Sequence, residues 1–231
     1  MTAGVPPAAP VAGRRTGSYR AAALELADRD PVLARLVRDG GLPRLPRPAE
    51  THFATLVRSV VYQQLAGAAA RAIHGRLLLA LEDDVTPERV MATDVSALRA
   101  AGLSGRKTES LRDLAAKVLD GTVILEARRL GRLDDEEIIT RLSSVQGIGR
   151  WSAQIFLIYQ LRRLDIWPTG DLGIRRGYGL AWGTQTPSPR QLEGLGEPYR
   201  PYRTVVAWYC WRAVSLYCDG GTVTPVTGTG R

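Results

Sequence analysis

Helical periodicity dominates the pattern of apolar and polar residues along the chain. Apolar side chains at Phe53, Leu56, Val57, Val60 and Val61 follow the i, i+3, i+4, i+7, i+8 spacing of one helix face. Convincing alternation of period two, which is typical of strands, is absent from the sequence. The pattern therefore predicts an all-α protein.

Residues with strong capping preferences indicate where several helices start. Ser18 is expected to cap a first helix that runs through Asp28, and Asp30 followed by Pro31 starts a second helix. Two capping boxes are predicted from the pairs Asp134 with Glu137 and Ser188 with Gln191. Further helices are expected over residues 67–81, from Thr86, from Asp94, up to Gly121 and over residues 201–218.

The two Pro-rich stretches near the start of the chain predict irregular structure. Residues 1–17 are rich in Pro, Gly and Ala without periodicity, and we expect a disordered tail there. Residues 42–48 contain three prolines and are expected to form a linker.

Composition excludes several classes of protein. The chain has 231 residues, of which 45% are hydrophobic, enough for one large core or two small lobes. No apolar run approaches the ~18 residues of a membrane helix, and no secretory signal is recognisable. Two cysteines are too few for a four-cysteine iron–sulfur cluster, and Cys210 and Cys218 lie too far apart on one helix for a disulfide. We expect a reduced, cytoplasmic protein, nucleoid-associated if bacterial.

The excess of positive charge points to a polyanionic partner. The formal net charge is +8, and only two of the 31 basic residues, Lys107 and Lys117, are lysines. Arginine suits phosphate contacts because its planar guanidinium donates two parallel hydrogen bonds. A GC-rich coding sequence also explains the preference for arginine over lysine, but it does not explain the net charge.

A turn with two closely spaced glycines separates two predicted helices. Its sequence is Val145-Gln146-Gly147-Ile148-Gly149, and Arg150-Trp151 follows. Backbone amides in such a turn and at the start of the next helix lack internal partners, which suits a DNA phosphate. The alternative is an ordinary glycine turn within a helical bundle.

Two motifs together resemble the helix–hairpin–helix (HhH-GPD) DNA glycosylase superfamily. They are the hairpin at residues 142–153 and the loop Trp167-Pro168-Thr169-Gly170-Asp171 with its continuation to Arg176. The Gln63-Gln64-Leu65 step and the segment from Arg203 to Trp211 narrow the resemblance to the DNA-3-methyladenine glycosylase II (AlkA-like) branch. The resemblance covers residues 30–218 and implies two helical lobes, an active site in the cleft between them and no N-terminal β-domain. We expect one lobe over residues 47–163, and a second from 18–46 with 164–231 that carries Asp171.

The resemblance implies that Asp171 is catalytic. Cleavage of an N-glycosidic bond builds positive charge on the sugar, and a carboxylate near C1′ stabilises that charge and holds the attacking water. An Asp that follows Gly is otherwise most often a helix N-cap, and both roles are compatible. Lyases of the superfamily carry a lysine where this chain has Trp151, so the resemblance implies a monofunctional enzyme that uses water.

The resemblance also implies a pocket for the extruded base. Trp151 and Trp211 occupy positions where the family places aromatic rings, which favour a cationic alkylated base. Ile155 and Leu172 replace aromatic residues of the family, and Gln63 completes the expected pocket. The alternative places both tryptophans in the core or at the contact between lobes.

DNA contacts are implied at two further places. The hairpin residues Gln146, Gly147, Ile148, Gly149 and Arg150 correspond to a phosphate-binding turn, in which the carbonyls of Ser143, Val145 and Ile148 match an alkali-ion site (Na⁺ or K⁺). Gln64 and Leu65 match the wedge that fills the gap left by the extruded base. Alternatively, Leu65 continues the apolar helix face of Val57 and Val61.

The resemblance therefore implies a monomeric DNA glycosylase without a catalytic cofactor, acting on duplex DNA that contains damaged bases. The expected substrates are alkylated bases of the 3-methyladenine and 7-methylguanine type. A glycosylase of the same fold for a deaminated or oxidised base is one alternative. A member that binds damaged DNA without catalysis is another, and a plain DNA-binding hairpin module is a third.

Overall fold

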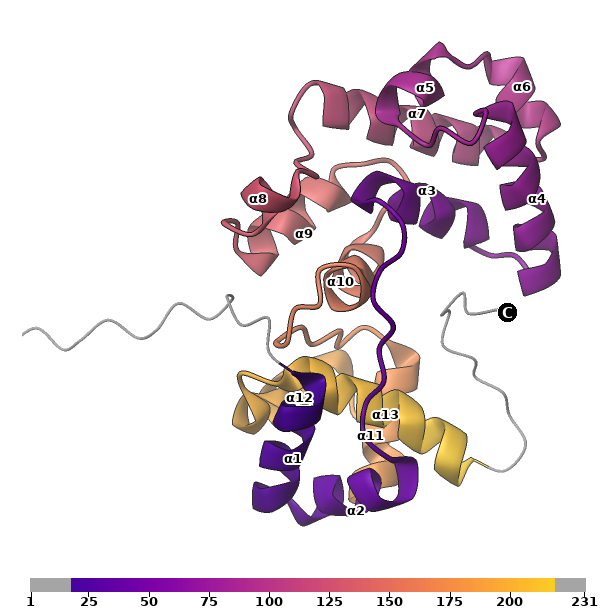
Figure 1. Ribbon diagram of the computed structural model, residues 1–231. Helices are drawn as coiled ribbons and strands as arrows, with labels where there is room; N and C mark the ends of the chain where they lie inside the picture. Colours follow the sequence, from indigo (N-terminus) through magenta and orange to yellow (C-terminus); the bar gives the residue numbers. More distant parts are fainter. Residues whose placement is uncertain (1–17, 219–231) are drawn as a thin grey trace, which may run out of the picture. The chain divides into compact units, whose positions relative to one another are not determined.

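The protein is helical throughout the part of the chain that the structure describes, residues 18–218. In this computed structural model every regular element in that range is a helix (Figure 1), which confirms the predicted all-α class. The tail predicted over residues 1–17 lies outside the described residues. No helix within 18–218 combines the length and the apolar composition required to cross a membrane.

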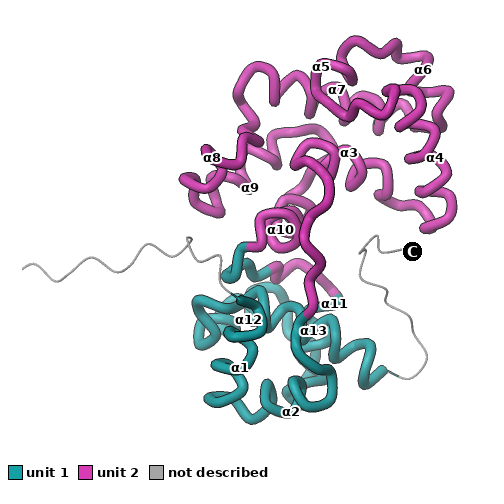
Figure 2. The backbone as a smooth tube through the Cα atoms, in the orientation of Figure 1, with its two compact units in different colours: residues 1–43, 163–167, 173–231 teal, residues 44–162, 168–172 magenta. Residues whose placement is uncertain are grey.

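The chain forms two compact units, coloured separately in Figure 2. Among the described residues, unit 1 contains 18–43, 163–167 and 173–218, and unit 2 contains 44–162 and 168–172. These bounds differ from the expected lobes at one important place. The short segment 168–172, which includes Asp171, groups with the hairpin in unit 2, whereas the sequence analysis assigns it to the lobe formed by the chain ends.

Unit 1 is built around the pairing of helices from both ends of the chain. Its helices are α1 (Tyr19–Arg29), α2 (Pro31–Gly40), most of α11 (Leu172–Trp182), α12 (Pro189–Gly196), α13 (Arg203–Tyr217) and a short 3-10 helix (Glu197–Tyr199). Helix α13 packs against α1 and α2, and the side chains of Leu26, Leu33 and Tyr209 are fully buried. Burial of this apolar surface holds together segments that are far apart in sequence.

Unit 2 contains the two motifs of greatest functional interest. Its helices are α3 (His52–Tyr62), α4 (Gly67–Ala80), α5 (Pro87–Ala92), α6 (Val95–Ala100), α7 (Gly105–Leu119), α8 (Ala127–Leu130), α9 (Asp135–Ser143) and α10 (Arg150–Tyr159). Helix α7 packs against α3, α5 and α6, while α10 packs against α9 and α3. The fully buried Leu111 and Leu114 place α7 at the centre of this unit.

Most of the predicted helix starts are confirmed, with one correction. Ser18 and Asp30 accept backbone N–H groups of α1 and α2, and Ser188 forms the predicted reciprocal box with Gln191. Asp134 accepts the amide of Glu137 at 2.7 Å, but the Glu137 carboxylate pairs with Arg141 one turn further along α9. Only half of the predicted box forms there, because an i, i+4 ion pair engages the glutamate instead.

Candidate active site

Asp171 lies at the start of α11, in a loop that folds back onto unit 2. Its backbone amide donates to the carbonyl of Pro168 at 3.0 Å, which closes a turn immediately before the helix. The indole Nε1 of Trp151 donates a hydrogen bond to Asp171 Oδ2 at 2.7 Å. The structure therefore brings together the two residues on which the expected chemistry depends, and the indole fixes the orientation of the carboxylate.

One face of α10 is directed toward this carboxylate. Trp151, Ile155 and Tyr159 are spaced four residues apart, so their side chains lie along the same side of the helix. Burial, together with the negative charge of Asp171, raises the pKa of the Tyr159 hydroxyl to about 12. The sequence analysis missed Tyr159, although its spacing from Trp151 and Ile155 was a signal that could have revealed it.

The other expected pocket residues differ in their surroundings. Leu172, directly after Asp171, is 49% exposed, and Ile155 is half-buried. Gln63 uses its side-chain amide within unit 2, where Nε2 donates to the carbonyl of Gly147 at 2.9 Å. Trp211 lies half-buried on α13 of unit 1. Gln63 was predicted to line the base pocket. In the structure its side-chain amide contacts the hairpin.

The hairpin between α9 and α10 is anchored by two buried apolar residues. Val145 and Ile148 are 2% and 3% exposed, while the residues between them face outward. Gly147 has φ +81°, a left-handed conformation that favours glycine, and an added Cβ would lie 2.5 Å from Ser110 Oγ. Gly149 has an ordinary φ of −89°, and a Cβ there would meet nothing within 4 Å. The fold therefore requires glycine at position 147 but not at position 149.

Only some of the hairpin amides are available for an anion. The amide of Gln146 donates to Asp113 Oδ2 at 2.7 Å, and that of Ile148 donates to the carbonyl of Val145 at 3.1 Å. Within residues 18–218, the amides of Gly147 and Gly149 have no hydrogen-bond partner, and no side chain caps α10. An anion would therefore bind at these glycines and the first turn of α10.

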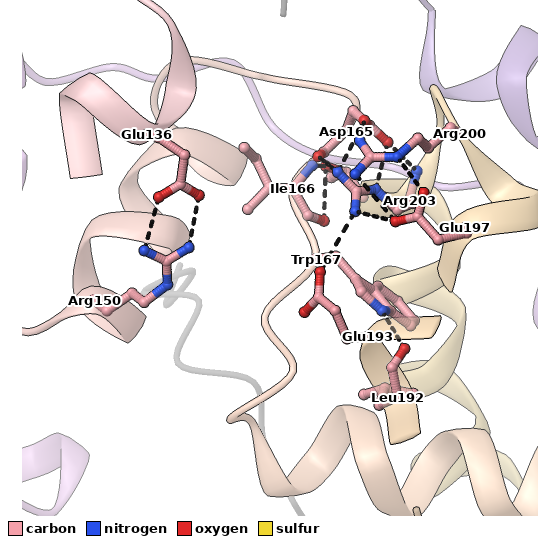
Figure 3. A network of polar contacts seen from close by, with 11 residues as sticks. Glu136, Arg150, Asp165, Ile166, Trp167, Leu192, Glu193, Glu197, Arg200 and Arg203 are labelled. Atoms are coloured by element: carbon pink, nitrogen blue, oxygen red, sulfur yellow. Dashed lines mark hydrogen bonds and ion pairs between the residues drawn. The ribbon is translucent and has the colours of Figure 1, made fainter. Parts of the chain in front are cut away.

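Arg150 is engaged by a carboxylate on the protein surface. Its guanidinium forms two hydrogen bonds with Glu136, at 2.6 and 2.8 Å, as the dashed lines in Figure 3 show. Both side chains are more than half exposed. Exposed pairs of this kind contribute about 1 kcal/mol or less to stability.

The Gln63-Gln64-Leu65 step lies outside the helix that precedes it. Helix α3 ends at Tyr62, and Gln64 has a left-handed backbone with φ +56°. Leu65 is 38% exposed, whereas Val57 and Val61 are buried. Leu65 therefore does not continue the apolar face of α3, and its side chain is partly exposed in the loop that follows the helix.

The described residues contain no cluster of side chains suited to bind a metal ion. Across residues 18–218, no group of three or more His, Cys, Asp or Glu side chains is placed to hold a metal ion. Cys210 is buried and Cys218 is exposed, and the two cysteines do not form a disulfide with each other.

Comparison with known proteins identifies relatives that cover nearly the whole described chain. The family described as HhH-GPD superfamily base excision DNA repair protein matches residues 57–201. DNA-3-methyladenine glycosylase 1 of Schizosaccharomyces pombe is 35% identical over 204 residues, or 86% of this chain and 89% of that protein.

Solved structures of two proteins agree with this match. A 3-methyladenine DNA glycosylase of the same yeast, in complex with abasic DNA, has a TM-score of 0.72 and 33% identity, covering 85% of this chain and 98% of that one. A DNA-3-methyladenine glycosidase of Bacillus halodurans has a TM-score of 0.75 and 32% identity, covering 83% of this chain and 88% of that one. In both cases the sequence identity is above 30%, so the similarity is one of sequence as well as of fold.

Proposed function

Because this chain belongs to the HhH-GPD superfamily of base excision DNA repair proteins, we propose that it is a monofunctional DNA glycosylase for alkylated bases in duplex DNA. The observation that carries the proposal is the carboxylate of Asp171, held by the indole of Trp151 at 2.7 Å. The named relatives, which are 3-methyladenine glycosylases, support the choice of substrate class.

Asp171 supplies the charge that the reaction needs. As the bond between C1′ and the base nitrogen breaks, its electron pair leaves on the base and positive charge develops on the sugar. The carboxylate stabilises this charge, and water bonds to C1′ and loses a proton. Because the Trp151 indole already holds the carboxylate, little reorganisation is needed as the charge develops.

Alkylation of the base reduces the remaining demand on the enzyme. A purine alkylated at a ring nitrogen is cationic, so it leaves as a neutral base without a general acid. A cation over an aromatic face gains about 0.5–2 kcal/mol, and Trp151, which is 45% exposed, offers such a face next to Asp171. We assign Trp211, Ile155, Leu172 and Gln63 to the same base pocket.

The proposal is tested with oligonucleotide duplexes that carry one lesion each. We expect release of 7-methylguanine at a rate well above that of uracil or 8-oxoguanine from matched duplexes. Preferential release of a deaminated or oxidised base would favour a glycosylase for that lesion. Tight binding to all three lesions without release would instead indicate a member that only recognises damage.

Strand cleavage should not accompany base release. In the lyases of the superfamily a lysine amine attacks C1′, and the chain has only two lysines, Lys107 and Lys117. Lys107 donates to the carbonyls of Val61 and Gln63, and Lys117 pairs with Asp113. We therefore expect intact strands until alkali is added, and no covalent protein–DNA adduct after borohydride treatment. A strong trapped adduct would contradict the monofunctional assignment.

We assign the hairpin to the DNA backbone, with Gln146, Gly147, Ile148, Gly149 and Arg150 at a phosphate. Because Asp113 engages the Gln146 amide, the amides of Gly147 and Gly149 are the donors in this assignment. The carbonyls of Ser143, Val145 and Ile148 are hard oxygen donors of the kind that hold an alkali ion, although the Val145 carbonyl also accepts the Ile148 amide. Such an ion would help to fix the turn.

The two glycines of the hairpin allow phosphate binding to be separated from folding. We expect Gly149→Asp to fold normally but to lose about 10-fold or more in affinity for damaged and undamaged duplexes alike, because it sets a negative charge against the phosphate. Gly147→Ala should instead lower the melting temperature, because of its left-handed φ and the contact with Ser110.

Melting temperature and duplex affinity are measured on the same preparations. Gly194→Asp is the matched control, since Gly194 also has open space at its Cβ but lies on α12. If Gly149→Asp remains folded and binds abasic-site DNA as tightly as the unmodified protein, the hairpin is not the phosphate-binding element.

A further inference from the structure

Helix α7 carries the only two lysines of the chain, and both support backbone elsewhere in unit 2. Lys107 Nζ donates to the carbonyls of Val61 and Gln63, at 2.7 and 2.8 Å. Lys117 Nζ, ten residues further along α7, donates to Asp113 Oδ2 at 2.8 Å and to the carbonyl of Ser144. One lysine therefore supports the end of α3, and the other supports the end of α9.

The Lys107 contact lies where the chain leaves α3 for an exposed loop. Carbonyl groups at the C-terminus of a helix are unpaired and carry partial negative charge, which an ammonium group satisfies. The next residue, Gln64, adopts a left-handed backbone that is unfavourable for a residue with a Cβ. Lys107 binds the carbonyl that immediately precedes this residue, so it stabilises the conformation that presents Leu65 to solvent.

The hairpin is attached to the same helix by independent contacts. Asp113 accepts the amide of Gln146 at 2.7 Å, and Glu109 accepts its side-chain amide at 3.1 Å. Gly147 lies against Ser110, with no room for a side chain between them. Along α7, the residues that hold the loop after α3 and those that hold the hairpin are therefore neighbours.

A direct hydrogen bond links the two loops. The backbone carbonyl of Gln63 accepts a hydrogen bond from Lys107 Nζ, while its side-chain amide donates to the carbonyl of Gly147 at 2.9 Å. One residue thus connects Lys107 to the tip of the hairpin. Displacement of the loop would also disturb this connection.

We propose that Lys107 is a positioning residue for the duplex wedge formed by Gln64 and Leu65. By holding the Gln63 carbonyl, it fixes the wedge loop to α7 and, through the Gln63 side chain, to the hairpin. The wedge then enters the duplex at a fixed distance from the phosphate that the hairpin binds. This proposal rests on the proposed function, in which a base is extruded from duplex DNA.

If Lys107 positions the wedge, the effect of its removal on the excision rate should depend on whether the damaged base is paired. Extrusion of a paired base costs a few kcal/mol, and the cost is smallest when the base is already mismatched. A well-placed wedge offsets part of this cost, so loss of its support should slow excision mainly where the lesion is paired. A lysine that served only to stabilise the fold would affect paired and mismatched lesions equally.

The test compares single-turnover excision of 7-methylguanine opposite cytosine with excision of the same lesion opposite a mismatched adenine. We expect Lys107→Met to slow release about 10-fold or more from the paired duplex and less than about 3-fold from the mismatched one. Lys107→Arg, which keeps the charge and the donors, should restore part of the rate. Arg20→Met removes one positive charge from the exposed surface of α1 and should change neither rate.

A double-mutant cycle with Leu65→Ala identifies the route of the effect. If Lys107 acts through the wedge, the double variant should be hardly slower than Leu65→Ala alone. Equal slowing on both duplexes, no slowing on either, or additive effects of the two substitutions would overturn the proposal. If the unmodified protein releases no base from either duplex, the proposed function itself fails, and this inference fails with it.

Discussion

Asp171→Asn should slow single-turnover base excision at least ~100-fold, the scale expected when one strong electrostatic stabiliser of a transition state is removed. The introduced side chain has nearly the same shape, and its amide oxygen still accepts the hydrogen bond from Trp151 Nε1. The substitution removes the negative charge that stabilises the developing sugar cation, and it replaces the second carboxylate oxygen with an NH₂ group. Affinity for a duplex with an abasic site should therefore change little.

The matched control is Asp28→Asn, which removes one negative charge from the exposed surface of α1. Its excision rate should equal that of the unmodified protein. A rate for Asp171→Asn within a factor of about three of the unmodified protein, well short of the loss expected for an electrostatic stabiliser, would refute the catalytic assignment. It would also leave Asp171 as a helix cap for α11.

The second large effect concerns stability and arises from the buried ion pair of unit 1. Arg203 and Asp165 contact each other through two side-chain hydrogen bonds, at 2.8 and 3.0 Å, and both side chains are only 9% exposed (Figure 3). Arg203→Met leaves the Asp165 carboxylate largely buried with fewer partners. Removal of one partner from a buried pair typically costs about 3–5 kcal/mol of the free energy of unfolding. Because Arg200 still pairs with Asp165 at 2.7 Å, we expect the lower end of this range.

Neighbouring contacts hold the segment that leads to the loop containing Asp171. Thr204 Oγ1 accepts the amide of Ile166 at 2.9 Å and donates to the carbonyl of Arg163 at 2.8 Å, so residues 163–167 are bound along the start of α13. Trp167 Nε1 donates to the carbonyl of Leu192 at 2.8 Å. The segment is therefore fixed immediately before the turn that contains Asp171.

Arg150→Met is the natural comparison, because the Arg150–Glu136 pair has similar distances but lies on the surface. Loss of the Arg150–Glu136 pair should reduce the free energy of unfolding by no more than about 1 kcal/mol. Denaturant titration of both variants measures the difference. Equal destabilisation by the two substitutions would show that burial does not set the strength of these pairs.

Local sequence signals predicted the helices well because the determining interactions are local. Ser18, Asp30 and Ser188 cap helices within three residues of themselves. Asp94 was expected to start a helix in the same way, and α6 does begin at Val95, but its side chain makes no capping hydrogen bond. Helix starts thus followed from the sequence, whereas two of the predicted side-chain contacts did not form: the Asp94 cap and the Glu137 half of the box at Asp134.

The contacts that position the candidate site were not predictable in the same way. Lys107 reaches carbonyls more than 40 residues earlier in the chain, and Gln63 reaches Gly147 across 84 residues. Such pairs arise only when helices pack, and no periodicity along the chain encodes them. The grouping of Asp171 with unit 2 is a further result of packing, because the predicted boundary followed sequence order.

The chemistry of the hairpin was predicted only in outline. The Gly-Ile-Gly spacing correctly placed a turn between two helices, but the two glycines have different reasons to be there. At Gly147 the backbone is left-handed and Ser110 lies too close for a side chain. At Gly149 the backbone is ordinary, and there is open space where a Cβ would lie. This distinction requires φ angles and neighbours, which the residue types alone do not provide.

Identification of the bases released from methylated genomic DNA tests the central claim most directly. DNA treated with a methylating agent is incubated with the protein, and the free bases are identified by mass spectrometry, with Asp171→Asn and untreated DNA as controls. On treated DNA we expect much more 3-methyladenine and 7-methylguanine from the unmodified protein than from Asp171→Asn, whose release should lie near the spontaneous level, and neither base from untreated DNA. Failure to release any alkylated base, or release in equal amounts by Asp171→Asn, would contradict the account.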